Sequence, residues 1–376
     1  MRALQISKFY PPVMGGIESV AWELTEGLNR SGVRCDVLCS NQRLRTESER
    51  AELGYDIVRA GSFGTLLSTS MAPAMAAGLR RMARQADLLH VHMPDPMAAM
   101  ALWLVRPEQP LVVHWHSDVV RQRLALKVYE PLQHWLLSRA DAIVATSQAY
   151  AQASRVLRAW RDKVAVIPIG ISDNREDGCN EMAAAIRQRF RKRKLVFALG
   201  RMTYYKGFEV LIDAAAELPD DCAVLIGGDG EMLDYYRGRI AERGLVGKVH
   251  LPGQILDHEL PSYFAACDVF CMPSTARAEA YGVAMLEAMV MSKPIVASDI
   301  AGSGVPWVNV DGETGLNVPV AQPQALAGAL RRVLEDEPLR QRLGAAARRR
   351  YLKDFSATLM TERTVGLYGR VLGLGA

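Results

Sequence analysis

Short apolar runs alternate with longer stretches of helical periodicity along most of the chain. Residues 2–9 form an apolar run typical of a strand, and Ile17, Val20, Leu24 and Leu28 then recur at helical spacing. Further runs expected to be strands lie at residues 34–39, 55–60, 88–92, 111–116, 142–146 and 164–169. Strands that alternate with helices in this way predict a parallel sheet with helices on both faces.

A second alternation begins at Leu195. Its apolar runs lie at residues 195–199, 223–226, 248–251, 268–272, 294–297 and 315–318, with a predicted helix at 208–217. A chain of 376 residues is too long for one ordinary core. We therefore expect an α/β protein with two doubly wound, Rossmann-like domains at residues 1–172 and 195–357. The polar stretch 173–194 would be a linker between them, and 358–376 a C-terminal helix.

Composition fits a soluble globular protein, with 23% charged and 49% hydrophobic residues. The net charge of +4 is too small to indicate a nucleic-acid partner. Residues 1–175 nevertheless hold 21 Lys and Arg against 16 Asp and Glu. This surplus fits contact with an anionic surface, and it fits an incidental imbalance equally well. Residues 121–139 mix basic and large apolar side chains, which suits either a helix lying on an anionic membrane or a core-facing helix with a solvated basic face.

The N-terminal segment lacks the apolar run and cleavage site of a signal peptide, and no apolar run approaches the ~20 residues that span a bilayer. We expect a cytoplasmic protein. The six cysteines form no C-x-x-C pair, so they are expected to be small core residues rather than metal ligands or disulfides.

Ligands of doubly wound sheets bind outside the carboxyl ends of the strands. In the first half that rule selects Gly15-Gly16, His92 to Asp95, His116 to Asp118, Ser147 and Gly170. His114 and His116 share one face of a strand, a spacing that could suit a metal, but no partner cluster of firm spacing accompanies them. Hydrogen bonding to a polar ligand is the favoured role of His116. The complete G-x-G-x-x-G pattern is missing, which disfavours a dehydrogenase.

In the second half, Arg201 and Lys206 bracket the loop after the first strand. An Arg fork and a Lys point charge together suit a diphosphate. No Asp-x-Asp motif is present to hold a divalent metal on such a group. We therefore expect binding of a diphosphate without a metal ion and without any other cofactor.

Glu279 and Glu287 lie on either side of a predicted helix start at Gly282 and Val283. Backbone N–H groups at a helix start form an anion-binding position. Carboxylates on both sides of such a position suit a ligand with hydroxyls at two ends and phosphate in the middle, which is the layout of a nucleotide sugar. The alternative is an ordinary solvated helix with two surface glutamates.

Taken in order, these segments resemble the family 4 retaining glycosyltransferases of the GT-B fold, notably bacterial polysaccharide and O-antigen mannosyl- and rhamnosyltransferases. The matching segments are Gly15-Gly16, His116, Gly200-Arg201 with Lys206-Gly207, Gly227 to Gly230, Glu279 with Glu287, and Gly312 to Leu316. One departure is Ile169, where many members carry Asn.

The resemblance implies an interdomain cleft that binds the nucleotide sugar, mostly on the second domain. Arg201 and Lys206 would bind the diphosphate, Glu287 the ribose, and Glu279 the transferred sugar. Amides around Gly282 and Val283 would meet phosphate and sugar, and Gly253, Gln254 and Ile255 would hold the base. Gly15-Gly16 and His116 would act from the first domain, with Asp95 or Asp118 facing the acceptor. The C-terminal helix would cross back to the first domain.

The resemblance favours transfer of mannose or rhamnose from a GDP-sugar to a saccharide or lipid-linked saccharide in lipopolysaccharide or other cell-surface polysaccharide assembly, with peripheral contact at the cytoplasmic face of the inner membrane. A UDP-hexose donor is the nearest alternative. A nucleotide-sugar epimerase and a non-catalytic nucleotide-binding partner subunit are two others.

Overall fold

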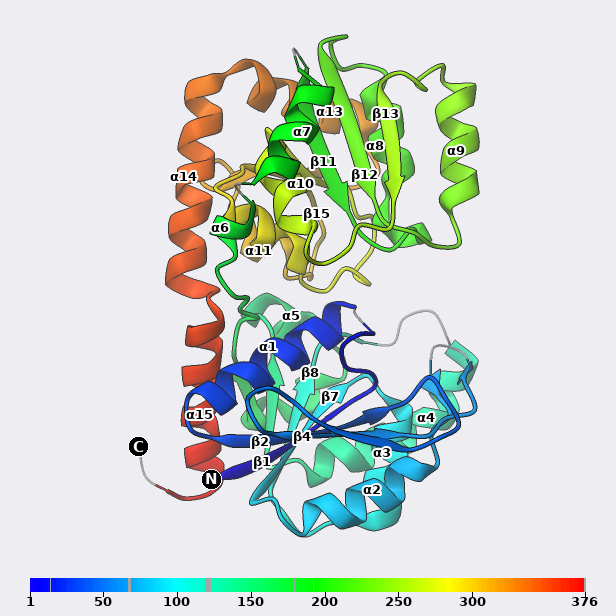
Figure 1. The fold of residues 1–376 in the computed structure, drawn as a ribbon, viewed down its shortest axis with the longest axis vertical. Coiled ribbons are helices and arrows are strands. Elements are labelled where there is room, and N and C mark those ends of the chain that lie inside the picture. Colours follow the sequence, from blue (N-terminus) through cyan, green and yellow to red (C-terminus); the bar gives the residue numbers. More distant parts are fainter. Residues whose placement is uncertain (14, 67–68, 119–122, 179, 192, 375–376) are drawn as a thin grey trace. The chain divides into compact units, whose positions relative to one another are not determined.

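The computed structural model of the chain describes residues 1–13, 15–66, 69–118, 123–178, 180–191 and 193–374, with the side chains of residues 123–128 excepted (Figure 1). Backbone contacts divide the chain into two compact units. The first comprises Met1–Ser172 and Ala357–Ala376, and the second comprises Asp173–Ser356. Both are α/β, as predicted.

The first unit contains an eight-stranded sheet in the order β10-β9-β8-β7-β1-β2-β4-β3, in which only β3 is antiparallel to its neighbour. Its strands are β1 (Arg2–Ser7), β2 (Arg34–Ser40), β3 (Glu47–Arg50), β4 (Asp56–Ala60), β7 (Leu88–Met93), β8 (Leu111–Trp115), β9 (Ala142–Ala145) and β10 (Val164–Val166). A separate two-stranded ribbon consists of β5 (Thr65–Leu66) and β6 (Thr69–Ser70). All the predicted strands of this half are present within a few residues. The sequence pattern missed β3, because a charged edge strand has no apolar run.

Helices cover both faces of this sheet. On one side α1 packs on β1 and β2 and lies beside α15, while α2 packs on β2 and β4 from the other side (Figure 1). The helices of the first unit are α1 (Gly16–Arg30), α2 (Ala74–Ala83), α3 (Pro96–Val105), α4 (Arg123–Arg139), α5 (Gln148–Ala153), the 3-10 helix η1 (Leu157–Lys163) and α15 (Ala357–Val371). The predicted basic helix corresponds to α4. Arg121 lies outside the described residues, as does the side chain of Lys127, so the membrane interpretation of this helix stays a prediction.

The second unit contains a six-stranded parallel sheet in the order β13-β12-β11-β14-β15-β16. Its strands are β11 (Lys194–Leu199), β12 (Cys222–Gly227), β13 (Val249–Gly253), β14 (Val269–Met272), β15 (Ile295–Asp299) and β16 (Gly315–Pro319). Its helices are α6 (Arg175–Gly178), α7 (Glu181–Arg189), η2 (Tyr204–Lys206), α8 (Phe208–Ala215), α9 (Leu233–Glu242), α10 (Leu260–Ala266), α11 (Val283–Val290), α12 (Val305–Val308), α13 (Pro323–Glu335) and α14 (Glu337–Asp354).

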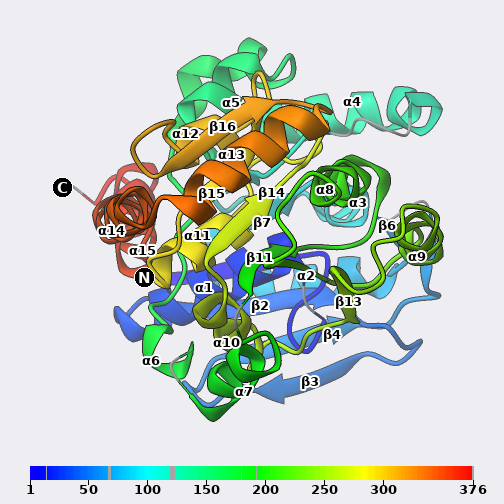
Figure 2. The same ribbon diagram turned by 90° about the horizontal axis from the view of Figure 1, so that it is seen from above.

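Alternate residues of its strands pack into cores on opposite faces. Val196 and Ala198 of β11 join the cluster under α8 and α13. Phe197, between them, faces the other way and stacks edge-on against Phe264 of α10, with 5.1 Å between ring centroids. Figure 2 shows α8 and α13 side by side, as their packing requires. A strand buried on both faces must be continuously apolar, which is why these strands were visible in the sequence.

The expected linker at residues 173–194 is instead part of the second unit. Its residues form α6 and α7, and both helices pack against α10. Arg187 forms a bidentate ion pair with Asp268, with nitrogen–oxygen distances of 2.9 and 3.0 Å, and Phe190 is buried. The stretch looked like a linker because it is polar and charged, yet charged side chains such as Arg187 and Arg189 lie on the exposed face of a packed helix.

The C-terminal helix belongs to the first unit, in agreement with the expected crossing back. The chain crosses between the two units twice, after Ser172 and before Ala357, and both residues hydrogen-bond within the first unit. Ser172 donates from its backbone N–H and its hydroxyl to Glu23 of α1, and Ala357 donates to the carbonyl of Ile171. At Gly27, α1 approaches α15 so closely that a Cβ atom would lie 2.1 Å from Thr361 Oγ1.

We predict that Gly27→Ala destabilises the first unit by about 1–3 kcal/mol, because an added methyl group would force α1 and α15 apart. Thermal or urea denaturation monitored by circular dichroism measures the change. Gly366→Ala is the matched control: it lies on α15, where the nearest atom to an added Cβ is Arg370 Nη1 at 3.8 Å. That control should be neutral or slightly stabilising. Equal loss in both variants would contradict this account of the contact.

Candidate functional site

The predicted site residues of the second unit lie at the carboxyl edge of its sheet. The chain order of the strands reverses between β11 and β14, so the loops that follow these two strands leave the sheet in different directions. Such a switch point is where doubly wound sheets bind ligands. Arg201 and Lys206 follow β11, and Glu279 follows β14.

Lys206 and Glu279 form an ion pair that joins these two loops. Lys206 Nζ lies 2.6 Å from Glu279 Oε2, and Ser274 Oγ donates to the same oxygen at 3.0 Å. The two side chains are only 14% and 10% exposed. Burial acts to lower the pKa of Lys206, but the adjacent Glu279 carboxylate outweighs it, so the pKa of Lys206 is raised and its ammonium stays charged. The sequence predicted both residues as ligands and gave no sign of their pairing.

Glycines let the loop after β11 approach the loops after β14 and β12. Gly207 has a φ of 65°, and a Cβ atom there would lie 2.1 Å from the carbonyl oxygen of Pro273. A Cβ atom on Gly228 would lie 2.0 Å from the Gly200 carbonyl oxygen. These glycines therefore serve loop packing at the switch point. Arg201, which lies between Gly200 and Gly207 in the chain, is exposed and able to reach a ligand.

Helix α11 begins at this edge with an open N-terminus. Gly282 caps it with a φ of 85° and, as a glycine, offers no side chain to the first N–H groups. A Cβ atom on Gly282 would lie 2.7 Å from Met272 Sδ, so only glycine fits. Val283 is the first helical residue, and Glu287 is half-buried in the second turn. The predicted sequence of carboxylate, helix start and carboxylate is therefore present.

The segment predicted to hold a base lies at the end of β13. Gly253 accepts a backbone hydrogen bond from Gly228 at 2.8 Å, and Gln254 is exposed. Ile255 is buried, with its Cδ1 2.5 Å from where a Cβ atom on Gly227 would lie. The side chain of Ile255 therefore fills the core, which leaves its backbone and Gln254 to meet a ligand.

In the first unit the chain order reverses between β1 and β7. Gly15 and Gly16 follow β1 and start α1, and both are exposed. A Cβ atom on Gly15 would lie 2.6 Å from Glu18 Oε2. His116 follows β8 at the same edge of the sheet.

The two residues expected to face an acceptor both make contacts that stabilise the fold, and their acceptor role stays a prediction. Asp95 is fully buried and caps α3, accepting through Oδ1 from the N–H groups of Met97 and Ala98 at 3.1 and 3.3 Å. Asp118 accepts through Oδ1 from Trp115 Nε1 at 3.0 Å and from Ser154 Oγ at 2.8 Å. These contacts, which both go to Oδ1, hold the loop after β8 to α5.

His116 belongs to a buried group of four histidines that was not predicted from the sequence. His90 and His92 of β7 lie beside His114 and His116, and all four are at most 6% exposed. Two H-x-H patterns on neighbouring strands were the available signal. Pairing of β7 with β8 in parallel, with His92 opposite His114, brings them together.

His90, His92 and His114 each offer a nitrogen within 4.8 Å of the others, a spacing that could suit a metal ion. The rings are stacked, however, with 23° between the planes of His90 and His92 and 24° between those of His92 and His114. Lone pairs of stacked rings run side by side instead of converging on a tetrahedral centre. The nitrogens of His90 and His92 are also already hydrogen-bonded. The arrangement favours a hydrogen-bonded cluster over a metal centre.

The two halves of the chain match two family models. "Glycosyltransferase Family 4" matches residues 14–175, and "Glycosyl transferases group 1" matches residues 182–350. The O-antigen chain mannosyltransferase C of Escherichia coli is 31% identical over 378 residues, covering 99% of each chain. The chain belongs to glycosyltransferase family 4.

A second relative of this glycosyltransferase is the D-rhamnosyltransferase WbpZ of Pseudomonas aeruginosa, which is 33% identical over 364 residues and covers 95% of this chain and 93% of the relative. Solved structures confirm the GT-B fold. Sucrose-phosphate synthase from Thermosynechococcus elongatus superposes with a TM-score of 0.81 at 20% identity, covering all of both chains. Anabaena HepE in complex with UDP and glucose gives 0.78 at 22% identity, covering 98% of this chain and 100% of that one.

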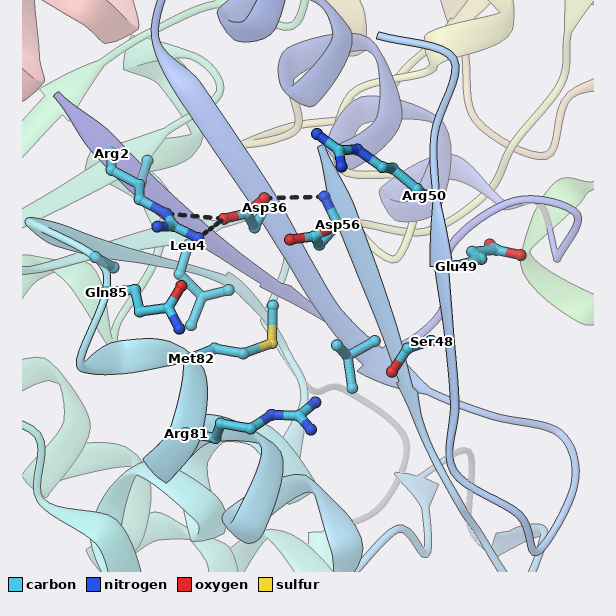
Figure 3. Close-up of a pocket in the computed structure, with 13 residues that line it drawn as sticks. Arg2, Leu4, Asp36, Ser48, Glu49, Arg50, Asp56, Arg81, Met82 and Gln85 are labelled. Carbon is cyan, nitrogen blue, oxygen red and sulfur yellow. Dashed lines mark hydrogen bonds and ion pairs between the residues drawn. The ribbon is translucent and has the colours of Figure 1, made fainter. Parts of the chain in front are cut away.

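A hollow in the first unit of the glycosyltransferase lies apart from these residues. The hollow, of about 380 Å³, opens at the amino ends of β1, β2 and β4, the edge opposite His116 (Figure 3). Its wall includes the ion pair of Arg2 with Asp36, and Arg50 and Arg81 lie on either side of the hollow.

Among the described residues, each helix is too short or too polar to span a bilayer. The five described cysteines are buried and unbridged, as expected of core residues.

We predict that Asp95→Asn stabilises the glycosyltransferase above pH 6 and has little effect near pH 4. Burial raises the pKa of Asp95 from its usual 3.8 to about 6. The folded state therefore favours the protonated acid, and the cost of ionising it grows as the pH rises from about 4 to 6. Asn caps a helix equally well without a charge, so the gain reaches at most ~3 kcal/mol. Denaturation midpoints at pH 4 and pH 8 measure it. An equal effect at both pH values would contradict the assignment.

We also predict that Lys206→Met destabilises the second unit by about 3 kcal/mol, because Glu279 would keep a poorly solvated charge without its cation. Adding Glu279→Gln should recover at least half of the loss, since the amide needs no counter-ion and can still bond to Ser274. The midpoints of urea denaturation of the two single variants and the double variant complete the cycle. Strictly additive effects would show that the ion pair contributes no coupling.

Proposed function

We propose that this glycosyltransferase moves a hexose from a nucleoside diphosphate sugar to a saccharide or lipid-linked saccharide, with retention of configuration and without a divalent metal ion. The observation that carries the proposal is the set of groups at the switch point of the second unit. An exposed Arg201, the Lys206–Glu279 ion pair and the open N-terminus of α11 lie in loops that leave one edge of one sheet.

The diphosphate would meet Arg201, Lys206 and the first N–H groups of α11. Arg offers two parallel donors to a phosphate, Lys a compact charge, and the helix start a positive dipole end. Together they would supply the charge that a metal ion otherwise provides. They would also stabilise the negative charge that develops on the leaving oxygen as the sugar departs.

Glu279 is suited to hold a sugar hydroxyl. Among described residues, both side-chain contacts to its carboxylate go to Oε2, from Lys206 and Ser274. Oε1 thus remains for a ligand, while the ion pair fixes the orientation of the carboxylate. Glu287, in the second turn of α11, would take the ribose hydroxyls. The base would meet the backbone around Gly253 and Ile255 and the side chain of Gln254.

Neither glutamate is assigned as a nucleophile. Glu279 is bonded to Lys206 and would act in binding, so the two-carboxylate scheme of glycoside hydrolases does not apply. We propose attack of the acceptor hydroxyl on the face that the diphosphate leaves, with the departing phosphate oxygen taking the proton of that hydroxyl. The C–O bond to phosphate breaks as the bond to the acceptor oxygen forms, and the configuration is retained.

The relatives favour mannose or rhamnose as the transferred sugar and GDP as the carrier. Two relatives that match nearly the whole chain at 31% and 33% identity are named as an O-antigen chain mannosyltransferase and a D-rhamnosyltransferase. We place the acceptor in O-antigen or related surface polysaccharide assembly, on the cytoplasmic face of the inner membrane. The basic surplus of residues 1–175 would suit the anionic lipid of that face.

A panel of GDP- and UDP-sugars tests the proposal, with hydrolysis and transfer followed by release of the nucleoside diphosphate. We expect turnover with GDP-mannose or GDP-rhamnose that is unchanged by EDTA and gives a retained linkage by NMR. Lys206→Met should reduce kcat/KM by about 100-fold or more, since it removes charge from the leaving-group position.

The matched control for this loss is Lys293→Met, because Lys293 bonds to the carbonyl of Ala265 with its Nζ at 2.8 Å and takes no part in the proposed site. It should keep near-normal turnover. The absence of turnover with every donor would overturn the proposal. Interconversion of a free UDP-sugar without an acceptor would instead identify an epimerase.

A further inference from the structure

The four histidines form a ladder across two neighbouring strands. His90 and His92 lie two residues apart on β7, and His114 and His116 lie two apart at the end of β8, so all four project from one face of the sheet. The rings of His114 and His116 are 4.2 Å apart and nearly parallel, at 11°. His116 is the most exposed of the four, at 6%, and stands at the carboxyl edge.

Hydrogen bonds connect the ladder into two separate branches. In one, Gln5 Oε1 of β1 lies 2.7 Å from His92 Nε2, and His92 Nδ1 lies 2.9 Å from His116 Nε2. In the other, the Tyr368 hydroxyl of α15 lies 2.6 Å from His90 Nδ1, and His90 Nε2 lies 3.3 Å from His114 Nδ1. Only the first branch ends at the strand edge.

Burial keeps these imidazoles neutral. It lowers the pKa of His114 to about 3 and, together with the neighbouring histidines, holds the pKa values of His92 and His116 well below their ordinary range. A neutral imidazole has one N–H donor and one acceptor nitrogen. Any partner that fixes the role of one nitrogen therefore fixes the role of the other.

This rule fixes the donor and acceptor nitrogens of the first branch one after another, starting from Gln5. Gln5 Oε1 can only accept, so His92 Nε2 carries the proton. His92 Nδ1 then accepts, which requires His116 Nε2 to carry its proton. His116 Nδ1 is left as an acceptor, and among the described residues nothing bonds to it.

We propose that Gln5 and His92 are positioning residues that hold His116 in its Nε2–H tautomer, so that Nδ1 accepts a hydrogen bond from a hydroxyl of the bound sugar or its acceptor. This inference rests on the proposed function for the ligand, whereas the tautomer itself belongs to the free protein. The neighbouring branch does not set His116, because no hydrogen bond between described residues joins the two branches.

The test compares two variants that each remove one buried partner from the ladder. Gln5→Met keeps the length of the side chain and removes the acceptor, which frees His92 and His116 to populate both tautomers. Tyr368→Phe removes the hydroxyl from the other branch and is the control. Long-range ¹H–¹⁵N correlation spectra of histidine-labelled protein, assigned with His116→Gln, report which nitrogen carries the proton.

We expect a single Nε2–H tautomer of His116 in the unaltered protein and in Tyr368→Phe, and a mixture of tautomers in Gln5→Met. In the transfer assay Gln5→Met should lower kcat by about 10-fold, the effect typical of losing a group that orients an imidazole, while Tyr368→Phe stays within about twofold. His92→Asn should fall between them, because its amide can still face His116. Circular dichroism identifies any variant that fails to fold, and the spectrum of the unaltered protein alone still decides the tautomer.

Three results would overturn the inference: a His116 Nδ1–H tautomer in the unaltered protein, an unchanged tautomer in Gln5→Met, or a stabilising shift on adding Zn²⁺ that is lost in His114→Ala, which would make the ladder a metal site. Failure of the proposed function is distinguishable. If the protein transfers no sugar but shows the expected tautomers, the relay stands and its ligand is wrong. If it transfers sugar with the other tautomer, the transferase stands and the relay is wrong.

Discussion

Parallel strand pairing is the constraint on which the rest of this molecule depends. It places the carboxyl ends of all strands of a sheet at one edge, and the reversal of strand order then leaves two adjacent loops diverging from that edge. In the second unit those loops carry Lys206 and Glu279, which are 73 positions apart in the chain and 2.6 Å apart in space. The glycines beside this pair have no Cβ atom, which lets the backbones of neighbouring loops pack in direct contact. The ammonium of Lys206 and the carboxylate of Glu279 can therefore pair in a largely buried position.

In the first unit, parallel strand pairing brings four polar imidazole side chains together in a buried position. Four imidazoles on one sheet face would each be costly without partners, and among the described residues hydrogen bonds satisfy every ring nitrogen except His114 Nε2 and His116 Nδ1. The partners come from three distant parts of the sequence: β1 supplies Gln5, the adjacent strands supply each other, and α15 supplies Tyr368. A network of this kind selects one arrangement of its strands, because a slip by one residue would turn every ring to the other face.

Sequence patterns predicted the fold well, since strands buried on both faces must be continuously apolar. They predicted the switch-point residues Arg201, Lys206, Glu279 and Glu287 as a set, but could not reveal the Lys206–Glu279 pairing, which depends on strand order. The sequence pattern missed the charged strand β3 and the packed helices α6 and α7. These elements are short and rich in charged residues, so their apolar positions are too few to show a helical or strand period, and the segments resemble loops or linkers. The capping role of Asp95 was not predicted, although Asp-Pro before an apolar run is a helix-start signal that the local sequence contains. The histidine ladder required the register of β7 and β8, which no single strand contains.

The position of Tyr368 has a consequence for biosynthesis. A ribosome releases the strands and most helices of the first unit early, then makes the whole of the second unit, and only afterwards makes α15. Until then His90 lacks its hydroxyl partner, and the face of α1 around Gly27 lacks the helix that covers it. The unit that is begun first is therefore completed last, and a nascent chain that stops short of residue 368 leaves its oldest part exposed to the cell's quality control.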